Sequence, residues 1–448
     1  MARSDLFKKY DVPAPRYTSY PTVPYWDANP TTGEWFESIE KGLGPLGSWS
    51  LYIHVPFCES LCTFCGCNTS ITKNHKIELP YVHHLLNELN LYLQNCPSLL
   101  DRPLKSIHLG GGSPTFLSPE SFQSLIEPIL SKVKLGSEME GSIEIDPRRT
   151  KKEQLKILRK LGFNRVSLGV QDFNPEIQRL IHRIQPFEMT KVVTDDSREL
   201  GYESVNFDLI YGLPRQTLET IEAMIEKTIS LKPDRIALYS FALVPWIKPA
   251  QRLFKDEDVP QGELKRKLYE KARDLLLQAG YIEIGMDHFA LPTDALARAD
   301  AEGRMHRNFM GYTDQKTEVM VGLGVSSIGE SPACFHQNEK ILTKYEESLN
   351  HNRIPTLRGH KLTVEDQICR RQILSLMCTG RVSLLDRAQR ADIEIYLKPL
   401  LSDKLIDLTE HELRILPEGK PFLRNACVVF DKRLRLKSPE TRIFSQSL

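Results

Sequence analysis

The stretch His54-Val-Pro-Phe-Cys-Glu-Ser-Leu-Cys-Thr-Phe-Cys-Gly-Cys67 contains four of the nine cysteines of the chain. Three residues separate Cys58 from Cys62, and two separate Cys62 from Cys65. Three thiolates at this spacing are typical of a loop that binds a 4Fe-4S cluster, and they leave one iron without a protein ligand. An open metal position is where an outside ligand binds and reacts. The stretch therefore predicts a catalytic cluster held by Cys58, Cys62 and Cys65.

Two other interpretations of the cysteines are weaker. A structural zinc site takes four ligands, commonly as two CxxC pairs, and no second such pair is present. A disulfide framework is typical of short secreted chains, whereas this chain has 448 residues, an odd number of cysteines and no apolar signal segment after Met1. We therefore expect reduced thiols and a cytoplasmic location. Five further cysteines are expected to pack in the interior: Cys96, Cys334, Cys369, Cys378 and Cys427.

Composition predicts an ordinary globular protein of two or more domains, because 448 residues exceed the size of a single core and 41% are hydrophobic. Lys and Arg number 59 against 58 Asp and Glu, so the formal charge of +1 argues against a nucleic-acid or membrane surface. The sequence contains no apolar run of about 18 residues, the length that a spanning helix needs.

Between residues 48 and 245, short β-rich runs alternate with segments of helical period. This alternation is typical of β-α units whose strands form a parallel sheet. The runs cover residues 51–55, 106–109, 142–145, 165–170, 205–211 and 235–241. Six units are too few to close an eight-stranded barrel. We therefore predict an α/β fold with a partial (β/α)6 TIM-like barrel.

Glycines and polar residues follow these runs one after another. Ligands of such folds collect at the carboxyl ends of the strands, so one shared site would explain these residues. They are the cysteine loop, Gly110-Gly111-Gly112-Ser113, Glu144, Gln171 and Asp208. Taken singly, a glycine run is as often a tight turn, and a carboxylate in an apolar strand is often half of an internal ion pair. Arg183 is one possible partner for these carboxylates. Tyr52 and Phe64 flank the loop and could cover a ligand or shield the cluster.

The cysteine spacing, with Phe64 before the third cysteine, resembles the motif of the radical S-adenosylmethionine enzymes. The glycine turn resembles their methionine-binding motif. Further segments are similar to one family among them, the oxygen-independent coproporphyrinogen III oxidases, also called dehydrogenases. These segments are Pro15-Arg-Tyr-Thr-Ser-Tyr-Pro21, Leu51-Tyr-Ile-His-Val-Pro-Phe57, Cys67, Gly169-Val-Gln-Asp-Phe173, Asp208-Leu-Ile-Tyr-Gly-Leu-Pro214, Gly285-Met-Asp-His-Phe289 and His306-Arg-Asn-Phe-Met-Gly-Tyr312. The resemblance covers nearly the whole chain.

The resemblance implies a 4Fe-4S cluster on Cys58, Cys62 and Cys65, with one or two molecules of S-adenosyl-L-methionine. Cys67 matches a fourth cysteine that the family needs for activity without its being a ligand. The implied S-adenosylmethionine contacts are Tyr52, Phe64, Gly111, Gly112, Ser113, Glu144, Gln171, Arg183, Asp208, Ala242 and Ile328. Ser113 replaces the commoner threonine and Phe116 a tyrosine, and both swaps keep the hydroxyl or the ring.

The implied activity is an oxidative decarboxylation in haem biosynthesis. A 5'-deoxyadenosyl radical takes a hydrogen atom from the β-carbon of a propionate, and loss of carbon dioxide and one electron leaves a vinyl group. Two rounds convert coproporphyrinogen III to protoporphyrinogen IX, with electrons from a donor of the flavodoxin or ferredoxin type. The substrate carboxylates need cations, and Arg16, Arg304 and Arg307 are candidates unless they are solvated surface residues. Among the residues other than ligands, Cys67 and Arg307 are predicted to be catalytic.

A haem-binding chaperone of the same superfamily is the alternative function. Such paralogues share the three cysteines and the glycine turn, but they usually lack Cys67 and the stretch from Pro15 to Pro21. The haem-degrading radical methyltransferases likewise lack the last two segments quoted above. Both comparisons favour the oxidase. We further expect a monomer that binds neither nucleic acid nor membrane.

These patterns predict a division of the chain into four parts. Residues 1–47, rich in proline, are predicted to be an extended segment, and residues 48–245 to form the partial barrel. Residues 246–360 are expected to extend the sheet and to supply elements of the substrate site. Residues 361–448 have helical periods and predict a small, mainly helical C-terminal domain.

Overall fold

The computed structural model describes residues 3–246 and 248–436 of the chain. Its contacts define two compact units, and each is described here by itself. We call residues 27–259 with 317–361 the barrel unit, and residues 1–26 with 260–316 and 362–448 the terminal unit. The boundaries of the four parts predicted from the sequence differ from those of these units, and the predicted division stays a prediction.

Six parallel strands form the centre of the barrel unit, in the order β1-β4-β5-β6-β7-β8. All six predicted strands are confirmed. Their bounds are β1 (Trp49–Val55), β4 (Leu104–Gly111), β5 (Leu135–Ile145), β6 (Phe163–Gln171), β7 (Ser204–Tyr211) and β8 (Arg235–Ser240). Because Val55 lies beside Gly111 and Gly169 beside Asp208, the carboxyl ends of these strands share one edge.

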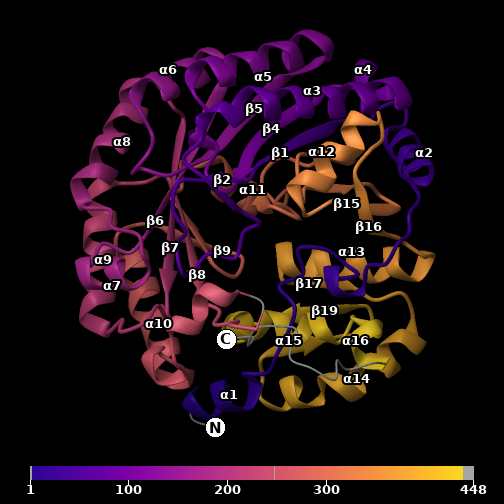
Figure 1. Cartoon of the computed structure of the whole chain (residues 1–448). Helices are drawn as coiled ribbons and strands as arrows, with labels where there is room; N and C mark the ends of the chain where they lie inside the picture. The colour runs from indigo at the N-terminus through magenta and orange to yellow at the C-terminus, as the bar shows by residue number, and fades with distance from the viewer. Residues whose placement is uncertain (1–2, 247, 437–448) are drawn as a thin grey trace. The chain divides into compact units, whose positions relative to one another are not determined.

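Helices cover the outer side of these strands (Figure 1). They are α3 (Glu78–Asn95), α5 (Pro119–Lys132), α6 (Lys152–Lys160), α7 (Pro175–Leu180), α8 (Phe187–Glu199) and α9 (Leu218–Leu231). Local sequence explains where they start: Ser118 Oγ caps α5 and Asn174 Oδ1 caps α7, each followed by proline at the first helical position. Helix α3 buries Tyr81, Leu85 and Leu89 at helical spacing, so its apolar side packs on the sheet.

The sheet continues beyond β1 through four strands from the later part of the chain. Strand β13 (Val319–Leu323) pairs in parallel with β1, and three antiparallel strands follow. They are β14 (Ile328–Glu330), β15 (Cys334–Asn338) and β16 (Thr356–Lys361). The unit also contains α2 (Thr32–Leu43), α4 (Ser98–Asp101) and α12 (Leu342–Asn350), and β2 (Phe57–Cys58) pairs with β3 (Ser70–Ile71). The expected sheet extension is thus confirmed.

The terminal unit is mainly helical, as predicted for the C-terminal part. Its helices are α1 (Arg3–Tyr10), α10 (Gly262–Gln278), α11 (Ala295–Ala301), α13 (Val364–Thr379), α14 (Arg387–Ser402), α15 (Leu423–Val428) and α16 (Lys432–Leu436). Two hairpins join them, β9 (Ile282–Ile284) with β10 (His288–Ala290) and β11 (His306–Asn308) with β12 (Gly311–Thr313). A small sheet of β17 (Arg381–Ser383), β19 (Glu412–Ile415) and β18 (Ile406–Leu408) was not expected from the helical periods.

The first residues of the chain belong to the core of the terminal unit. Phe7, Tyr10, Tyr17 and Tyr20 are buried in one cluster with residues of α13, α14 and α15. Tyr17 Oη donates to Asp431 Oδ2 at 3.1 Å, and Arg424 Nε donates to the Pro15 carbonyl at 3.0 Å. Helices α1 and α2 within residues 1–47 were not expected, because the many prolines suggested extended chain.

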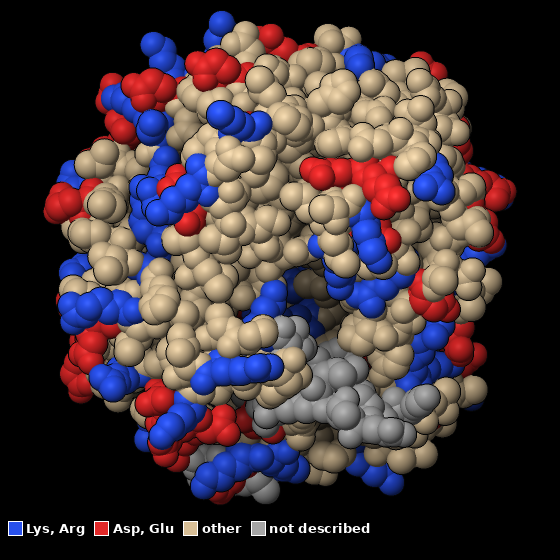
Figure 2. Space-filling model, viewed as in Figure 1, with Lys and Arg blue, Asp and Glu red and all other residues tan. Residues whose placement is uncertain are grey.

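Charge and hydropathy of the described residues agree with the composition. Lys and Arg are interspersed with Asp and Glu on the face shown in Figure 2. Within residues 3–246 and 248–436, no helix has the length and apolar character needed to cross a bilayer.

Candidate functional site

The cysteine loop is pinned at both ends to the edge of the barrel. Ser70 N donates to the Pro56 carbonyl at 2.8 Å, and Thr72 N donates to the Cys58 carbonyl at 2.9 Å. Inside the loop, Cys67 N donates to Cys65 Sγ at 3.4 Å. These bonds fold the loop back on itself, so the thiols are presented by one short, anchored segment.

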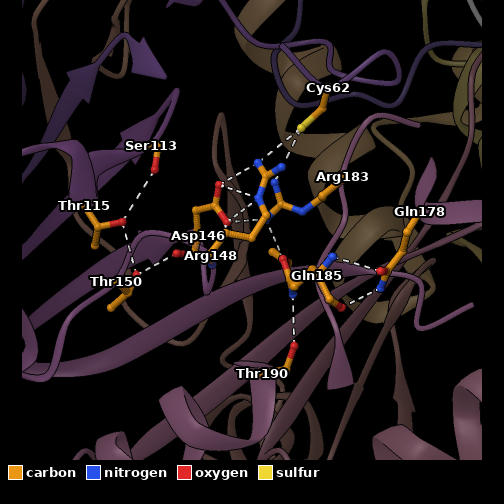
Figure 3. Close-up of polar contacts among 11 residues, drawn as sticks. Cys62, Ser113, Thr115, Asp146, Arg148, Thr150, Gln178, Arg183, Gln185 and Thr190 are labelled. Atoms are coloured by element: carbon orange, nitrogen blue, oxygen red, sulfur yellow. Dashed lines mark hydrogen bonds and ion pairs between the residues drawn. The ribbon is translucent and has the colours of Figure 1, made fainter. Parts of the chain in front are cut away.

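Two arginines donate to the sulfur of Cys62, and one carboxylate holds both of them (Figure 3). Arg148 Nη2 lies 3.5 Å and Arg183 Nη1 3.6 Å from Cys62 Sγ. Asp146 Oδ2 accepts from Arg148 Nη2 at 2.7 Å, and Asp146 Oδ1 from Arg183 Nη2 at 3.2 Å. Two guanidinium groups therefore lie against one sulfur of the loop, and both are held there by Asp146.

The thiols of the loop differ in acidity. A hydrogen bond with Cys67 lowers the pKa of Cys65 to about 6, and Lys248 and Arg183 act in the same direction. The same hydrogen bond raises the pKa of Cys67. Burial, together with Cys65 and Cys62, raises the pKa of Cys58 to about 12. Cys65 is therefore the thiol most readily deprotonated among these three.

The donor set fits an iron-sulfur cluster better than a single metal ion. In the part of the chain that the structure describes, no three His, Cys, Asp or Glu side chains converge on one point as a single ion requires. Thiolates of a cluster bind different irons and do not need to converge. Three thiols on one anchored loop, with guanidinium donors behind Cys62, suit that group.

A polar group lies beside the loop on β1, β4 and β5. Tyr52 Oη and His54 Nδ1 are 3.0 Å apart, and the Tyr52 ring stacks on His108 with 5.9 Å between centroids. Glu144 Oε2 accepts from the Gly111 amide at 3.1 Å, and His108 Nε2 is 3.5 Å from Glu144 Oε1. Against the effect of burial, His108 and Gly111 lower the pKa of Glu144. Glu144 is thus a carboxylate, held at the glycine turn and able to accept further donors.

Packing explains the glycines of the turn after β4. Gly111 has φ +118°, and a Cβ on it would lie 2.8 Å from the His54 ring. A Cβ on Gly112 would lie 2.6 Å from the Pro56 carbonyl oxygen. The positive φ of Gly111 is a backbone conformation that glycine adopts readily and other residues rarely adopt. The close approach is made to β1 and the start of the cysteine loop, which fixes the turn against the loop.

Gln171 is the last residue of β6, Arg183 lies in the loop after α7, and Asp208 lies within β7. Gln171 has φ +69°, and Arg183 Nη2 donates to the Gly169 carbonyl at 2.7 Å. Asp208 Oδ2 accepts from Ser167 Oγ at 2.8 Å, and Asp208 Oδ1 accepts from Asn206 Nδ2 at 2.9 Å. Arg183 therefore pairs with Asp146 rather than with the two carboxylates considered from the sequence.

A pocket opens where the cysteine loop meets the ends of β4 and β5. Its lining residues are Cys58, Glu59, Ser60, Ser113, Phe116, Asp146, Arg148 and Arg149. Ser113 Oγ is 3.5 Å from Thr115 Oγ1, and the Phe116 ring stacks on His75 at 4.2 Å between centroids. The pocket combines thiol, hydroxyl and guanidinium groups with one aromatic face.

The remaining predicted residues of the barrel unit have apolar surroundings. Phe64 packs against the cluster formed by Ile177, Ile181 and their neighbours. Ala242 follows β8 and is half-buried, and Ile328 is buried at the start of β14. Of the five cysteines expected in the interior, Cys96, Cys334, Cys369 and Cys427 are buried and Cys378 is half-buried.

The three candidate arginines belong to the terminal unit and differ in environment. Arg307 on β11 is buried, with its guanidinium 4.4 Å from the Tyr312 ring centroid and its Nε without a hydrogen-bond partner among the described residues. Arg16 pairs with buried Asp287, which is also 2.7 Å from His288 Nδ1. Arg304 is exposed and pairs with Glu302, so it is a solvated surface residue, which is the alternative considered from the sequence.

Asp146 and Arg148 were not singled out from the sequence. Their positions carried a usable signal, because both directly follow the third predicted strand at the edge where the other site residues gather. What the sequence could not give is the contact of Arg148 with Cys62, since 86 residues separate them.

The site defines the class of the protein, and comparison with known proteins agrees. Residues 52–228 match the model of the Radical SAM superfamily. The chain is 37% identical over 442 residues to the oxygen-independent coproporphyrinogen III oxidase of Escherichia coli K12, which covers 97% of this chain and 96% of the relative. It is 39% identical over 432 residues to the enzyme of the same name from Paracoccus denitrificans, with 94% of both chains covered.

A solved structure of the coproporphyrinogen III oxidase from Escherichia coli, described as a radical SAM enzyme, matches with a TM-score of 0.89. The identity is 37%, and the match covers 94% of this chain and 98% of that chain. The chain therefore belongs to the family of oxygen-independent coproporphyrinogen III oxidases. It is a radical SAM oxidoreductase, whose cofactors are a 4Fe-4S cluster and S-adenosylmethionine.

Proposed function

We propose that this chain converts coproporphyrinogen III to protoporphyrinogen IX without oxygen, by oxidative decarboxylation of two propionates. The observation that carries the proposal is the anchored loop of Cys58, Cys62 and Cys65 beside the Glu144–Gly111 contact, in a chain similar over nearly its full length to oxidases of this name. When bound, the cluster and S-adenosylmethionine supply the radical that takes a hydrogen atom from the substrate.

The residues of the barrel unit would divide the work of holding these cofactors. Cys58, Cys62 and Cys65 would bind the cluster, with Arg148 and Arg183 donating to Cys62. Further S-adenosylmethionine contacts stay as predicted from the resemblance: Tyr52, Phe64, Gly111, Gly112, Ser113, Glu144, Gln171, Arg183, Asp208, Ala242 and Ile328. Glu144 and Asp208 offer acceptors to hydroxyl or ammonium donors, and Gly111 fixes the turn against the loop.

Arg307 would bind a substrate carboxylate in the terminal unit. A buried guanidinium whose Nε lacks a hydrogen-bond partner in the described residues is costly unless an anion binds it. Asp287 lies close enough to affect it electrostatically but pairs with Arg16 and His288. Cys67 would assist at the cluster without being a ligand, because it hydrogen-bonds Cys65.

The remaining features of the proposal concern the setting of the enzyme. We propose a monomer in the cytoplasm that receives electrons from a flavodoxin- or ferredoxin-type donor and binds neither membrane nor nucleic acid. Mixed charges on the face in Figure 2 support the last point. Of the four predicted parts of the chain, residues 1–47 and residues 246–360 would contribute to the substrate site.

The deciding experiment is an anaerobic incubation of the reduced protein with S-adenosylmethionine and coproporphyrinogen III. The mixture is then oxidised and its porphyrins are separated. Protoporphyrin that appears only when all components are present is the expected result. Tight haem binding without protoporphyrin would instead support the haem-carrier alternative and contradict the proposal.

A further inference from the structure

Three cationic side chains gather beside the cysteine loop. Lys248 follows β8, Lys340 follows β15, and Arg358 lies near the start of β16. Strands β8 and β16 stand at the two ends of the barrel unit's own strand order, and the loop residues Cys67 and Asn68 contact the segments after β8 and β15. None of these three residues was among the predicted site residues.

Two consecutive residues of the loop hydrogen-bond to the ammonium group of Lys248 and to the backbone of Lys340. Lys248 Nζ donates to the Cys67 carbonyl at 3.0 Å. On the next residue, Asn68 Nδ2 donates to the Lys340 carbonyl at 3.0 Å. The end of the loop, at Cys67 and Asn68, therefore contacts both the segment that carries Lys248 and the segment that carries Lys340.

The cluster has no internal counter-ion. Among residues 3–246 and 248–436, none of the three cations pairs with a carboxylate: Lys248 contacts a carbonyl, and Arg358 Nε contacts Gln337 Oε1 at 2.9 Å. Burial, Arg358 and Lys248 lower the pKa of Lys340, so both other cations lie within electrostatic reach of Lys340. Arg148 and Arg183 at the same edge are, by contrast, paired with Asp146. Like charges left together beside a reaction site favour an anionic ligand.

We propose that Lys248, Lys340 and Arg358 form a binding site for a propionate carboxylate of the tetrapyrrole substrate, an inference that rests on the proposed function. An arginine and two lysines offer charge-assisted hydrogen bonds to a carboxylate. The site lies at the carboxyl edge of the sheet, where ligands of such folds bind.

The bound propionate is one that the reaction leaves intact. Loss of carbon dioxide removes the negative charge of a carboxylate, so cations that stabilise that charge in the ground state slow its loss. Since two of the four propionates remain in the product, the site fits one of these two. It should then bind substrate and product alike and fix which rings face the radical source.

The test measures porphyrin binding by the full chain with its cluster, under anaerobic conditions. The probe is coproporphyrin III, the stable oxidised form with four carboxylates, titrated by its absorbance. Lys248→Met, Lys340→Met and Arg358→Met should each raise its Kd about tenfold, the effect of one lost charge-assisted hydrogen bond. Lys340→Arg keeps the positive charge and should bind coproporphyrin III with the wild-type Kd. Iron content and circular dichroism confirm that each variant is folded.

Two controls isolate the charge at this place. Lys344→Met removes an exposed lysine of α12 four residues away and should leave the Kd unchanged. The tetramethyl ester of coproporphyrin has no carboxylate, so wild type and Lys340→Met should bind it alike. Wild-type affinity for coproporphyrin III in Lys340→Met and Arg358→Met would overturn the site.

Product binding tests whether the bound propionate is one that the reaction retains, and cofactor cleavage tests whether S-adenosylmethionine is the bound anion instead. Protoporphyrin IX should bind the three variants about tenfold more weakly too, and unchanged binding would overturn the assignment to a retained propionate. Formation of 5'-deoxyadenosine without substrate should stay at the wild-type rate in Lys340→Met and Arg358→Met. A loss there would mean that S-adenosylmethionine is the anion, which overturns the proposal. Wild type that binds coproporphyrin through these residues but forms no protoporphyrin would contradict the proposed function and leave the site standing.

Discussion

Asp146 and Arg183 form an ion pair with 3.2 Å between Oδ1 and Nη2, and the same arginine reaches the sulfur of Cys62. The pair connects the end of β5 to the loop after α7. Because Arg148 shares Asp146, one carboxylate helps to position two guanidinium groups behind the cluster loop, and the Gly169 carbonyl also holds Arg183. Asp146 is thus the carboxylate that both donors share.

Asp146→Asn should destabilise the cluster-free protein by about 3 kcal/mol, because it leaves two buried guanidiniums without their anion. Unfolding in urea, followed by circular dichroism, gives the shift in midpoint. Glu37→Gln is the matched control, since it breaks an exposed ion pair with Lys41 in α2 and should leave the midpoint unchanged. Equal midpoints for the two variants would contradict the importance of Asp146.

Cys58→Ser should abolish binding of the cluster, because serine does not replace a thiolate ligand to iron. The brown colour and the iron per chain are measured after anaerobic reconstitution. Cys96→Ser changes a buried cysteine outside the loop and should keep full iron. A Cys58→Ser protein with wild-type iron and activity would show that the cluster is bound elsewhere.

Arg307→Met should raise the KM for coproporphyrinogen III about tenfold or more, because a buried charge-assisted hydrogen bond to the substrate is lost. The rate of S-adenosylmethionine cleavage without substrate should not change. Arg304→Met, at an exposed arginine three residues away, serves as the control. Joint loss of substrate binding and of cofactor cleavage would argue against a carboxylate-binding role for Arg307.

Gly111→Ala should cost about 1–3 kcal/mol of stability, because alanine is strained at φ +118° and its Cβ would meet the His54 ring at 2.8 Å. Gly33→Ala in α2 meets no atom within 4 Å and should be neutral or stabilising by less than about 1 kcal/mol. Thermal unfolding of both variants provides the comparison. If Gly111→Ala unfolds like wild type, the turn does not need glycine there.

Glu88→Gln should change how stability depends on pH. Burial raises the pKa of Glu88 to about 7, although Gly324, Tyr345 and Asn338 donate to its carboxyl. The folded protein therefore keeps a proton that the unfolded chain releases above about pH 4.3, so this group makes stability fall between there and pH 7. Urea midpoints measured across this range should fall less steeply in the variant. Parallel profiles would mean that Glu88 titrates normally.

The parallel strands of the barrel unit could be predicted because their signals are local. Each run, such as 205–211, carries its own β-rich pattern between helical segments, and Ser118 and Asn174 mark helix starts by their own side chains. The cysteine spacing likewise carries its chemistry within eight residues. These features do not depend on how distant parts of the chain meet.

Contacts between distant residues could not be predicted in the same way. Arg183 is separated by 121 residues from Cys62, and Lys340 by 272 residues from Asn68. A single sequence gives no pairing for such residues, so the network behind Cys62 and the three cations beside the loop were missed. The grouping of the three segments of the terminal unit could not be predicted for the same reason, because they meet only through tertiary packing.

The packing of residues 7–20 in one core with residues of α13, α14 and α15 has a consequence for synthesis. Tyr17 leaves the ribosome 414 residues before Asp431, its hydrogen-bond partner. Until then the aromatic side chains of residues 7–20 lack the core that covers them, and transient exposure of such surface promotes aggregation. The core of the terminal unit therefore forms only after residue 431 has been synthesised, and a nascent-chain chaperone that shields residues 7–20 should raise the yield of folded protein.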